Sequence, residues 1–285
     1  MKKLGVIANC DKPRAAGVLR ELAEQAVRLG FELHAYAPTA GLLPGVVEGG
    51  VEQVLGMVDA VIALGGDGTM LTAVRELQGR DIPLMGVNIG SLGFMTSVAE
   101  ENLAAALECL KSGTYKVSER VVLEGVVRHN GSESRFCAMN DIVVTSGDSA
   151  RVIGVDVALG GCQVTSYLCD GLIISTPTGS TGHSLSAGGP ILTPETRAFV
   201  LSPICPHTLS SRPLVVPDAG EIEVRVERQS GASRLSVDGQ LLLSLDIGDT
   251  IIARRCAQRV RFLHLPDYDY FDVLRRKLLW RGSSV

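Results

Sequence analysis

The pattern of apolar and polar positions divides the chain into two parts with different periodicities. Up to about residue 115, short apolar runs typical of buried strands alternate with segments whose apolar residues recur at helical spacing. The runs at 4–8, 31–37, 58–64 and 82–87 predict strands, and the segments 11–29, 69–78 and 103–110 predict helices. Gly30 and Gly113 follow two of these helices, where glycine commonly ends a helix. Because strands and helices alternate, we expect a parallel sheet covered by helices.

From about residue 116 the pattern changes to short strands separated by Gly, Ser, Asn and Pro. Strands are predicted at 121–128, 135–145, 152–159, 172–176, 221–227 and 259–263, with a short helix near 193–201 and a terminal helix over 268–280. Residues 221–227 (EIEVRVE) alternate strictly, as a strand with one solvated face does. We therefore predict an α+β chain. It has a Rossmann-like α/β domain at 1–115, completed by a helix within 266–285, and an all-β, sandwich-like domain at 116–265.

Composition and charge exclude several classes of protein. The chain has 285 residues, 46% hydrophobic and 20% charged, with a net charge of -4, so we expect neither nucleic-acid nor membrane binding. Its seven cysteines are odd in number and form no CxxC pair, which argues against a zinc knuckle or a disulfide framework. The first apolar run is too short for a secretion signal. We expect a cytoplasmic protein.

The segment 61–69 (VIALGGDGT) is the first candidate for chemistry. A buried strand runs into the glycines Gly65, Gly66 and Gly68, and a helix follows. Such a turn lets backbone N–H groups approach a phosphate. It lacks the lysine of a Walker loop and the third glycine of a dinucleotide fingerprint. Asp67 within the turn would repel a passively bound phosphate, so it indicates a base or a cation ligand in phosphoryl transfer. The alternative is a tight turn in which Asp67 caps the helix.

Residues 175–182 (STPTGSTG) form a second polar turn after a buried strand. They contain five hydroxyl side chains, two glycines and one proline. Small hydroxyls offer donors and acceptors that suit ribose hydroxyls and phosphate oxygens. The spacing is not that of a serine hydrolase elbow. A surface loop without a ligand is the alternative interpretation.

Together these segments resemble the bacterial NAD kinases, the enzymes that form NADP. The resemblance lies in LGGDGTML (64–71), VNIGSLGFMT (87–96), AMNDIVVT (138–145) and DGLIISTPTGSTGHSLSAGGPI (170–191). It extends through SPICPHTLSSRPLVV (202–216) and SVDGQ (236–240). Because these segments follow one another in family order over nearly the whole chain, the resemblance is far more specific than the GGDGT turn, which other kinases share.

The resemblance implies roles for individual positions. Asp67 would be the base that draws the proton from the 2′-hydroxyl of the adenosine ribose. The phosphate loop would comprise Gly65, Gly66 and Thr69. The substrate would be bound by Gly68, Asn140, Asp141, Arg151, Asp170, Thr178, Thr181, Gly182, His183, Ser184, Leu185, Ser186 and Gln240. This sequence departs from the family in having Asp141 where glutamate is usual, His183 where tyrosine is usual, and Leu168 where lysine is frequent.

The same resemblance implies the reaction and its partners. We expect NAD in a cleft between the two domains, ATP or polyphosphate as the phosphoryl donor, and Mg²⁺ or another divalent ion without a dedicated protein cage. A homodimer or homotetramer joined through the β-rich domains is expected. The alternatives are a lipid or sugar kinase that shares the GGDGT turn, and a non-catalytic NADP-binding sensor.

Overall fold

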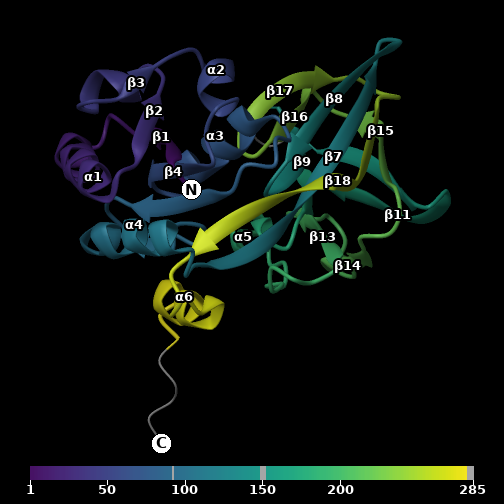
Figure 1. The fold of residues 1–285 in the computed structure, drawn as a ribbon. Helices are drawn as coiled ribbons and strands as arrows, with labels where there is room; N and C mark the ends of the chain where they lie inside the picture. Colours follow the sequence, from purple (N-terminus) through teal and green to yellow (C-terminus); the bar gives the residue numbers. More distant parts are fainter. Residues whose placement is uncertain (92, 148–151, 281–285) are drawn as a thin grey trace, which may run out of the picture. The chain divides into compact units, whose positions relative to one another are not determined.

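The computed structural model describes residues 1–91, 93–147 and 152–280, in which the chain divides into two units. The first unit comprises Met1–Glu119 and Val260–Val285, and the second comprises Arg120–Arg259. Figure 1 shows the elements of both units along the chain. No described helix is long and apolar enough to cross a membrane.

The first unit is a parallel sheet with helices on both faces. Its strands lie in the order β3-β2-β1-β4-β5, with the end of β18 beside β5 and with β6 also paired to β5. The elements are β1 (Lys3–Ala8), α1 (Ala15–Leu29), β2 (Glu32–Ala35), the 3-10 turn Thr39–Leu42, β3 (Val47–Glu48), α2 (Val51–Leu55), β4 (Ala60–Gly65), α3 (Asp67–Leu77), β5 (Leu84–Asn88), β6 (Val98–Ala99), the 3-10 turn Glu100–Asn102, α4 (Leu103–Ser112) and α6 (Tyr270–Lys277).

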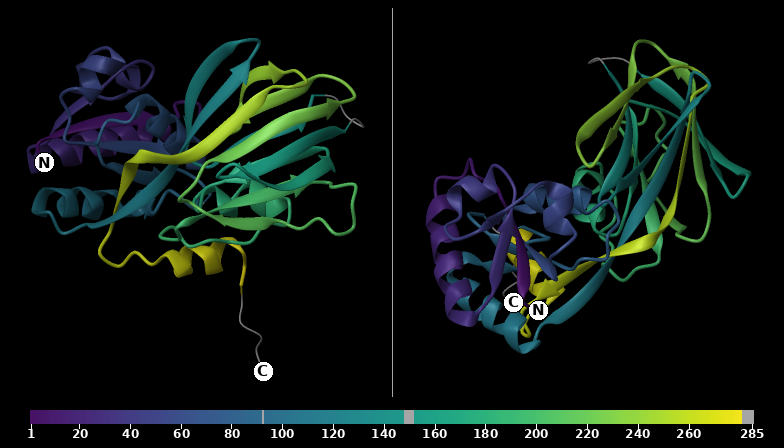
Figure 2. Two further views of the ribbon diagram at one scale, coloured as in Figure 1. Left: turned by 90° about the vertical axis from the view of Figure 1, so that its right-hand side faces the viewer. Right: turned by 45° about the horizontal axis from the view of Figure 1, so that its top comes forward.

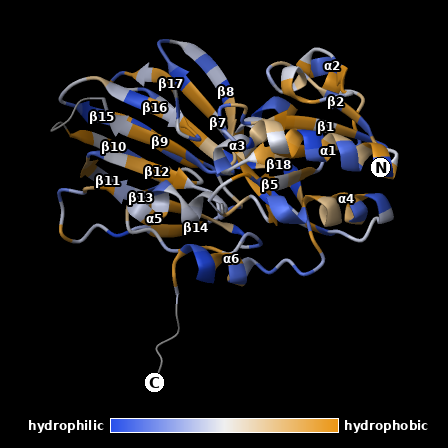
Figure 3. Cartoon of the chain, turned by 90° about the vertical axis from the view of Figure 1, so that its left-hand side faces the viewer, coloured by the Kyte–Doolittle hydropathy of each residue, from blue (hydrophilic) through white to orange (hydrophobic). Residues whose placement is uncertain are grey.

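The core of the first unit follows from its apolar strands. Every residue of β4 and β5 is buried, because helices cover both faces of the sheet. α1 and α4 pack together over one face, where Leu19, Leu22 and Leu107 meet Val6 and Ile62. α3 covers the other face (Figure 1). In Figure 3, β1 is mostly orange, as expected for a strand whose inner four residues are buried.

The second unit is built from two antiparallel sheets. One has the order β11-β10-β15-β18, with β7 paired to both β18 and β8, and the other has the order β14-β13-β12-β9-β16-β17. The elements are β7 (Lys116–His129), β8 (Ser132–Ala138), β9 (Asp141–Ser146), β10 (Ile153–Leu159), β11 (Cys162–Cys169), β12 (Gly171–Ser175), the 3-10 turn Gly179–Thr181, α5 (His183–Ser186), β13 (Ala198–Ile204), β14 (Leu214–Pro217), β15 (Ile222–Gln229), β16 (Ser233–Val237), β17 (Gln240–Leu245) and β18 (Thr250–His264).

Alternate residues of these strands form the core between the two layers, which can be followed in Figure 2. Val155, Val224 and Ile251 of one sheet belong to the same buried cluster as Ile174 and Phe199 of the other. β15 shows the alternation clearly, since its first six residues are buried and exposed in turn. This arrangement is the predicted sandwich-like domain.

Most of the predicted elements are confirmed, and two predictions were wrong. The helix predicted near 193–201 is absent: residues 193–197 form a turn and loop, and residues 198–201 begin β13, the strand between β12 and β14. The single strand predicted at 135–145 is two strands, β8 and β9, in different sheets. In addition, the end of β18 pairs with β5 at Phe262 and Leu84 and so lies in the first unit, although the pattern assigned it to the second domain.

Candidate functional site

The turn between β4 and α3 contains three glycines, of which the first is needed for packing and the other two are not. A Cβ on Gly65 would lie 2.0 Å from Thr69 Oγ1, so only glycine leaves room for the threonine hydroxyl. That hydroxyl in turn accepts a hydrogen bond of 3.5 Å from the N–H of Gly66, the residue that precedes α3. A Cβ on Gly66 or Gly68 would meet no described atom within 4 Å. Packing within the described residues therefore does not require glycine at either position, and the space there is open to a ligand.

Asp67, the first residue of α3, is held by the loop that follows β5. Its Oδ2 accepts a hydrogen bond of 2.8 Å from the N–H of Phe94, and its Oδ1 accepts one of 2.9 Å from the N–H of Met95. A Cβ on Gly93 would lie 2.1 Å from Oδ1, so this approach depends on glycine. The carboxylate thus bonds to a neighbouring loop and does not cap its own helix. The alternative interpretation, in which Asp67 serves as the cap of α3, is therefore excluded.

In the second unit, Asp238 organises the segment that contains Asn140 and Asp141. Its carboxylate accepts hydrogen bonds from the N–H groups of Met139, Asn140 and Asp141 at 2.8, 2.7 and 3.1 Å. The backbone of Asp238 has φ 48 and that of Gly239 has φ 76, as the Asp-Gly pair of a tight hairpin between β16 and β17 does. Asp238 lies within SVDGQ (236–240), where the resemblance gave it no role of its own. The signal that could have singled it out is this Asp-Gly pair between two strands.

Asp141 is a buried carboxyl group with an altered acidity. Its side chain is 6% exposed. Burial, followed by the nearby negative charge of Asp238, raises the pKa of Asp141 from 3.8 to about 7. The amide oxygen of the adjacent Asn140 is also buried and has no hydrogen-bond partner among the described residues. These two side chains are the strongest indication of a binding site in this unit, since buried polar groups are normally paired.

The hydroxyl-rich turn mostly satisfies its own hydrogen bonds. Thr176 Oγ1 donates to the carbonyl of Met139 at 2.6 Å and accepts from the N–H of Gly179 at 3.0 Å. Ser180 Oγ donates to the carbonyl of Pro177 at 2.7 Å and accepts from the N–H of Leu192 at 2.9 Å. These hydroxyls are fully buried, as is that of Ser175. Much of the run therefore stabilises the turn itself, and our expectation of many ligand donors was too broad.

The residues that are available to a ligand are neighbours of these buried hydroxyls. Thr178 is partly exposed and makes no described side-chain hydrogen bond, whereas Thr181 donates to the carbonyl of Thr178 at 3.1 Å. Ser184 is buried and bonds to Ser202 at 2.9 Å. The other predicted contacts are exposed or partly exposed: Gly182, His183, Leu185 and Ser186 at α5, and Gln240 at the start of β17.

Asp170 lies at the opposite end of β12 from Thr176. The five residues of β12 separate them, so the two Cα atoms are six residue steps or about 20 Å apart. Asp170 Oδ1 is 3.7 Å from Nε2 of His207, and both side chains are nearly half exposed. The structure thus gathers Asn140, Asp141 and Thr178 at one end of β12 and places Asp170 at the other. Arg151 lies outside the described residues.

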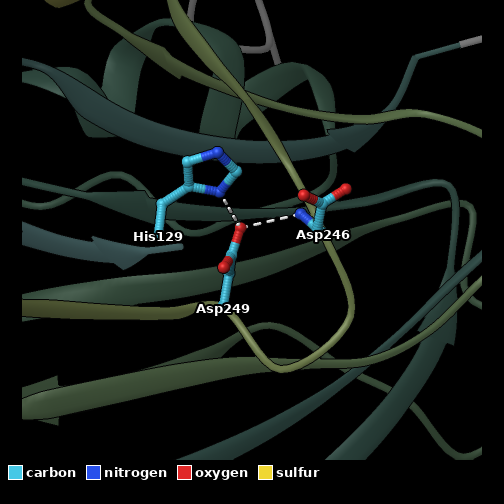
Figure 4. Close-up of side chains that lie close together, drawn as sticks. All are labelled: His129, Asp246 and Asp249. Carbon is cyan, nitrogen blue, oxygen red and sulfur yellow. Dashed lines mark hydrogen bonds and ion pairs between the residues drawn. The ribbon is translucent and has the colours of Figure 1, made fainter. Parts of the chain in front are cut away.

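A separate group of potential metal ligands is explained by hydrogen bonding. His129, Asp246 and Asp249 bring their ligand atoms within 4.8 Å of one another. Figure 4 shows that Asp249 is the centre of the group, accepting from His129 Nδ1 at 2.5 Å and from the N–H of Asp246 at 2.7 Å. The Asp249 carboxylate raises the pKa of His129. These bonds close the turn before β18 and tie it to the end of β7.

Comparison with known proteins decides the family. The model of the ATP-NAD kinase N-terminal domain matches residues 4–115, and that of the ATP-NAD kinase C-terminal domain matches residues 139–265. NAD kinases of Syntrophotalea carbinolica and Geobacter metallireducens are 39% and 41% identical over 287 and 286 residues, each alignment covering 98% of this chain and 99% of the relative. The chain belongs to the NAD kinase family.

Solved structures agree with this membership of the NAD kinase family. An NAD kinase from Archaeoglobus fulgidus in complex with ATP has a TM-score of 0.77 and 26% identity, with 98% of this chain and 100% of that one covered. Yeast NADH kinase complexed with NADH has a TM-score of 0.92 and 24% identity, with 100% and 89% covered, and shows a common fold. The predicted fold class and the predicted resemblance are therefore confirmed.

Proposed function

We propose that this chain transfers a phosphoryl group to the 2′-hydroxyl of the adenosine ribose of NAD and so forms NADP. Membership of the NAD kinase family supports the overall reaction. The observation that carries the assignment of roles is the Asp67 carboxylate, fixed by two backbone N–H groups at the open, glycine-lined N-terminus of α3.

In this proposal Asp67 is the general base. A carboxylate offers about four acceptor positions, and the N–H groups of Phe94 and Met95 occupy two of them. The remaining positions serve the substrate hydroxyl, whose proton moves to Asp67 as its oxygen attacks the terminal phosphorus of the donor. The bond from that phosphorus to the leaving phosphate oxygen breaks, giving NADP and the shortened donor. Orientation of the two reactants supplies most of the acceleration.

The donor in this proposal is ATP, and its phosphates approach the N-terminus of α3. The first N–H groups of a helix lack intrahelical partners, and the helix dipole favours an anion there. A divalent ion such as Mg²⁺ fits this arrangement, because Mg²⁺ keeps several waters and is held largely by substrate phosphates, so it needs no dedicated protein cage. When bound, the ion would neutralise charge on the donor phosphates.

On the substrate side, we propose that Asn140 and Asp141 receive NAD together with Thr178 and the residues around α5. The buried, unpartnered amide oxygen of Asn140 and the buried carboxyl group of Asp141 support this assignment. At neutral pH a part of the Asp141 population is protonated, since its pKa is about 7. Asp141 can therefore donate a hydrogen bond as well as accept one.

We further propose a homodimer or homotetramer joined through the β-rich unit, and a cytoplasmic location. β14 and β17 are the edges of the second sheet, and they expose Leu214, Val215 and Leu242. Exposed apolar edge strands favour association with another copy. All seven cysteines are free thiols, in keeping with a reducing compartment. Sedimentation velocity on the purified protein would measure the oligomeric state.

The decisive experiment incubates the purified protein with ATP, Mg²⁺ and NAD and measures NADP with an NADP-specific dehydrogenase. NADP formation supports the proposal. A protein that binds NADP but forms none is the non-catalytic sensor, and phosphorylation of a lipid or sugar in place of NAD identifies the other kinase alternative.

The role of Asp67 is tested by Asp67→Asn, for which we expect kcat to fall about 10²- to 10⁴-fold. Asp59→Asn is a matched control, because Asp59 precedes β4 and accepts hydrogen bonds from the N–H groups of Lys2 and Lys3 at 2.6 and 3.0 Å. Both variants exchange a carboxylate that is held by two backbone donors, and only one faces the phosphate turn. A folded Asp67→Asn protein with nearly full turnover excludes Asp67 as the base.

A further inference from the structure

The phosphate turn carries no positive side chain of its own. Residues 65–69 contain Asp67 and no lysine or arginine, so a polyphosphate bound there would add negative charge beside a carboxylate. A helix N-terminus supplies about half a positive charge, which is small against several phosphate charges. The loop after β5, at 89–97, has no basic residue either. A basic side chain from another loop at this edge of the sheet would add positive charge beside that of the divalent ion.

The loop after β1 supplies a candidate. Its basic residues are Lys12 and Arg14, and Arg14 pairs with Glu100. The side chain of Lys12 is partly buried, and its Nζ donates a hydrogen bond of 2.8 Å to the carbonyl of Ile89. The N–H of Ile89 in turn donates to the carbonyl of Gly65 at 2.9 Å. Lys12 thus bonds to the residue that is paired with the first glycine of the phosphate turn.

The position of Lys12 is fixed by its backbone. Asn9 closes the turn after β1, because its Oδ1 accepts from the N–H of Asp11 at 3.2 Å and its carbonyl accepts from the N–H of Lys12 at 3.3 Å. Gly90 has φ +127, where glycine is favoured, and a Cβ there would lie 3.1 Å from Lys12 Nζ. The loop after β5 therefore leaves a place for the ammonium group.

We propose that Lys12 contacts the phosphate chain of the phosphoryl donor and supplies the positive charge that the turn at 65–69 lacks. The inference rests on the proposed kinase function and adds to it a residue that recognises the donor. An ammonium group has three N–H donors, of which the Ile89 carbonyl uses one among the described contacts. The other two are available to phosphate oxygens. The ligand chemistry is a polyphosphate chain, as found in ATP and in inorganic polyphosphate.

The test compares Lys12→Met with Lys3→Met. Lys3 is at the opposite end of β1, where its Nζ is 3.8 Å from Glu32, so the control removes the same charge far from the turn. Calorimetry with Mg²⁺ present measures the Kd of ATP, inorganic tripolyphosphate and AMP. For Lys12→Met we expect the Kd of ATP and of tripolyphosphate to rise about 10- to 100-fold, the loss expected for one charge-assisted hydrogen bond. AMP binding and the KM for NAD should change less than about twofold, as should every value for Lys3→Met.

Further variants and ligands keep the proposal testable. Lys12→Arg keeps the positive charge and should retain most of the affinity for ATP. Lys12→Gln keeps a donor for the Ile89 carbonyl but not the charge, and should lose affinity for ATP as Lys12→Met does. Lys12→Gln thus tests the charge even if Lys12→Met lowers the unfolding midpoint. An unchanged Kd for ATP in a folded Lys12→Met or Lys12→Gln protein overturns the proposal. So does an equal loss of ATP affinity in Lys3→Met, or an equal rise of the KM for NAD in Lys12→Met.

Comparing the ligands distinguishes ATP from inorganic polyphosphate as the source of the phosphate chain. It also distinguishes failure of the Lys12 proposal from failure of the kinase proposal. An effect of Lys12→Met on tripolyphosphate equal to that on ATP assigns the contact to the phosphates common to both. If the wild-type protein forms no NADP but Lys12→Met still weakens ATP binding, the kinase proposal fails and the role of Lys12 stands. If the wild-type protein binds neither ATP nor tripolyphosphate, the role of Lys12 is refuted.

Discussion

The two glycine-containing turns of this molecule look alike in sequence and are used differently. Both follow a buried strand, β4 in one unit and β12 in the other, and both precede a helix. In the turn at 65–69, Gly66 and Gly68 face open space and Asp67 is oriented by another loop. In the turn at 176–181, the buried hydroxyls of Thr176 and Ser180 bond to the backbone of the turn and its neighbours.

This difference shows that small polar residues in a turn have two uses. They leave room and donors for a ligand, or they replace missing backbone hydrogen bonds within the fold. Burial separates the two, because Thr176 and Ser180 are 0% exposed while Gly68 is exposed. A change in the first turn should therefore alter activity, and a change in the second should mainly alter stability.

The largest contrast is expected from adding one methyl group to each turn region. Gly93→Ala places a Cβ 2.1 Å from Asp67 Oδ1 and must displace the carboxylate. We expect kcat to fall by about 100-fold, the usual effect of a misplaced reacting group. Gly179→Ala places a Cβ 2.2 Å from the carbonyl oxygen of Asn140 and should lower the free energy of unfolding by about 1–3 kcal/mol. Steady-state kinetics and urea unfolding of both variants measure this, and equal effects on stability contradict the contrast.

Asp141→Asn tests whether burial of a carboxyl group in the second unit lowers the free energy of unfolding at neutral pH. The folded carboxyl keeps its proton up to a pKa of about 7, and the unfolded one loses it near 3.8. As the pH rises between these values, only the unfolded chain ionises, so the free energy of unfolding falls and then stays level above about 7. We expect Asp141→Asn to abolish that fall and to be more stable than wild type by about 4 kcal/mol at pH 8, at about 1.4 kcal/mol per unit of pKa shift. Urea unfolding at pH 4 and pH 8 checks this, since the difference should be smaller at pH 4.

Two threonines within the second turn test the effect of burial directly. Thr176→Val removes a buried hydroxyl and leaves the Met139 carbonyl and the Gly179 N–H without that partner, which should cost about 1–2 kcal/mol of stability. Thr178→Val should change stability by less than about 0.5 kcal/mol and should raise the KM for NAD if Thr178 contacts the substrate. Thermal unfolding and NAD titration separate the two. Equal destabilisation by both substitutions argues against the distinction.

The smallest expected effect is a gain in stability at the first turn. Gly68 is helical and a Cβ there meets no described atom within 4 Å, so Gly68→Ala should stabilise the fold by about 0.5–1 kcal/mol. The same methyl group would occupy the space proposed for the ligand, so activity should fall. A higher melting temperature with unchanged kinetics would show that nothing binds close to Gly68.

The sequence could predict the two architectures because their periodicities differ. Continuous apolar runs such as β4 predicted a sheet buried on both faces, and the alternation of 221–227 predicted a strand with one solvated face. It could not predict β13 correctly, because a short apolar run has no periodicity of its own and its central place between β12 and β14 is decided by pairing. The break between β8 and β9 was missed for a similar reason, since a strand that changes sheets keeps its strand-like composition.

By itself the sequence determined the family, the fold class and the chemical character of the phosphate turn, because these depend on residue types at short spacings. Only the tertiary structure decided which groups surround each turn. It brought Phe94 and Met95 to Asp67, Asp238 to the backbone of Asn140, and Lys12 to the loop beyond β5. These contacts join residues far apart along the chain, where loops of neighbouring strands meet at one edge of a sheet, so no local pattern records them.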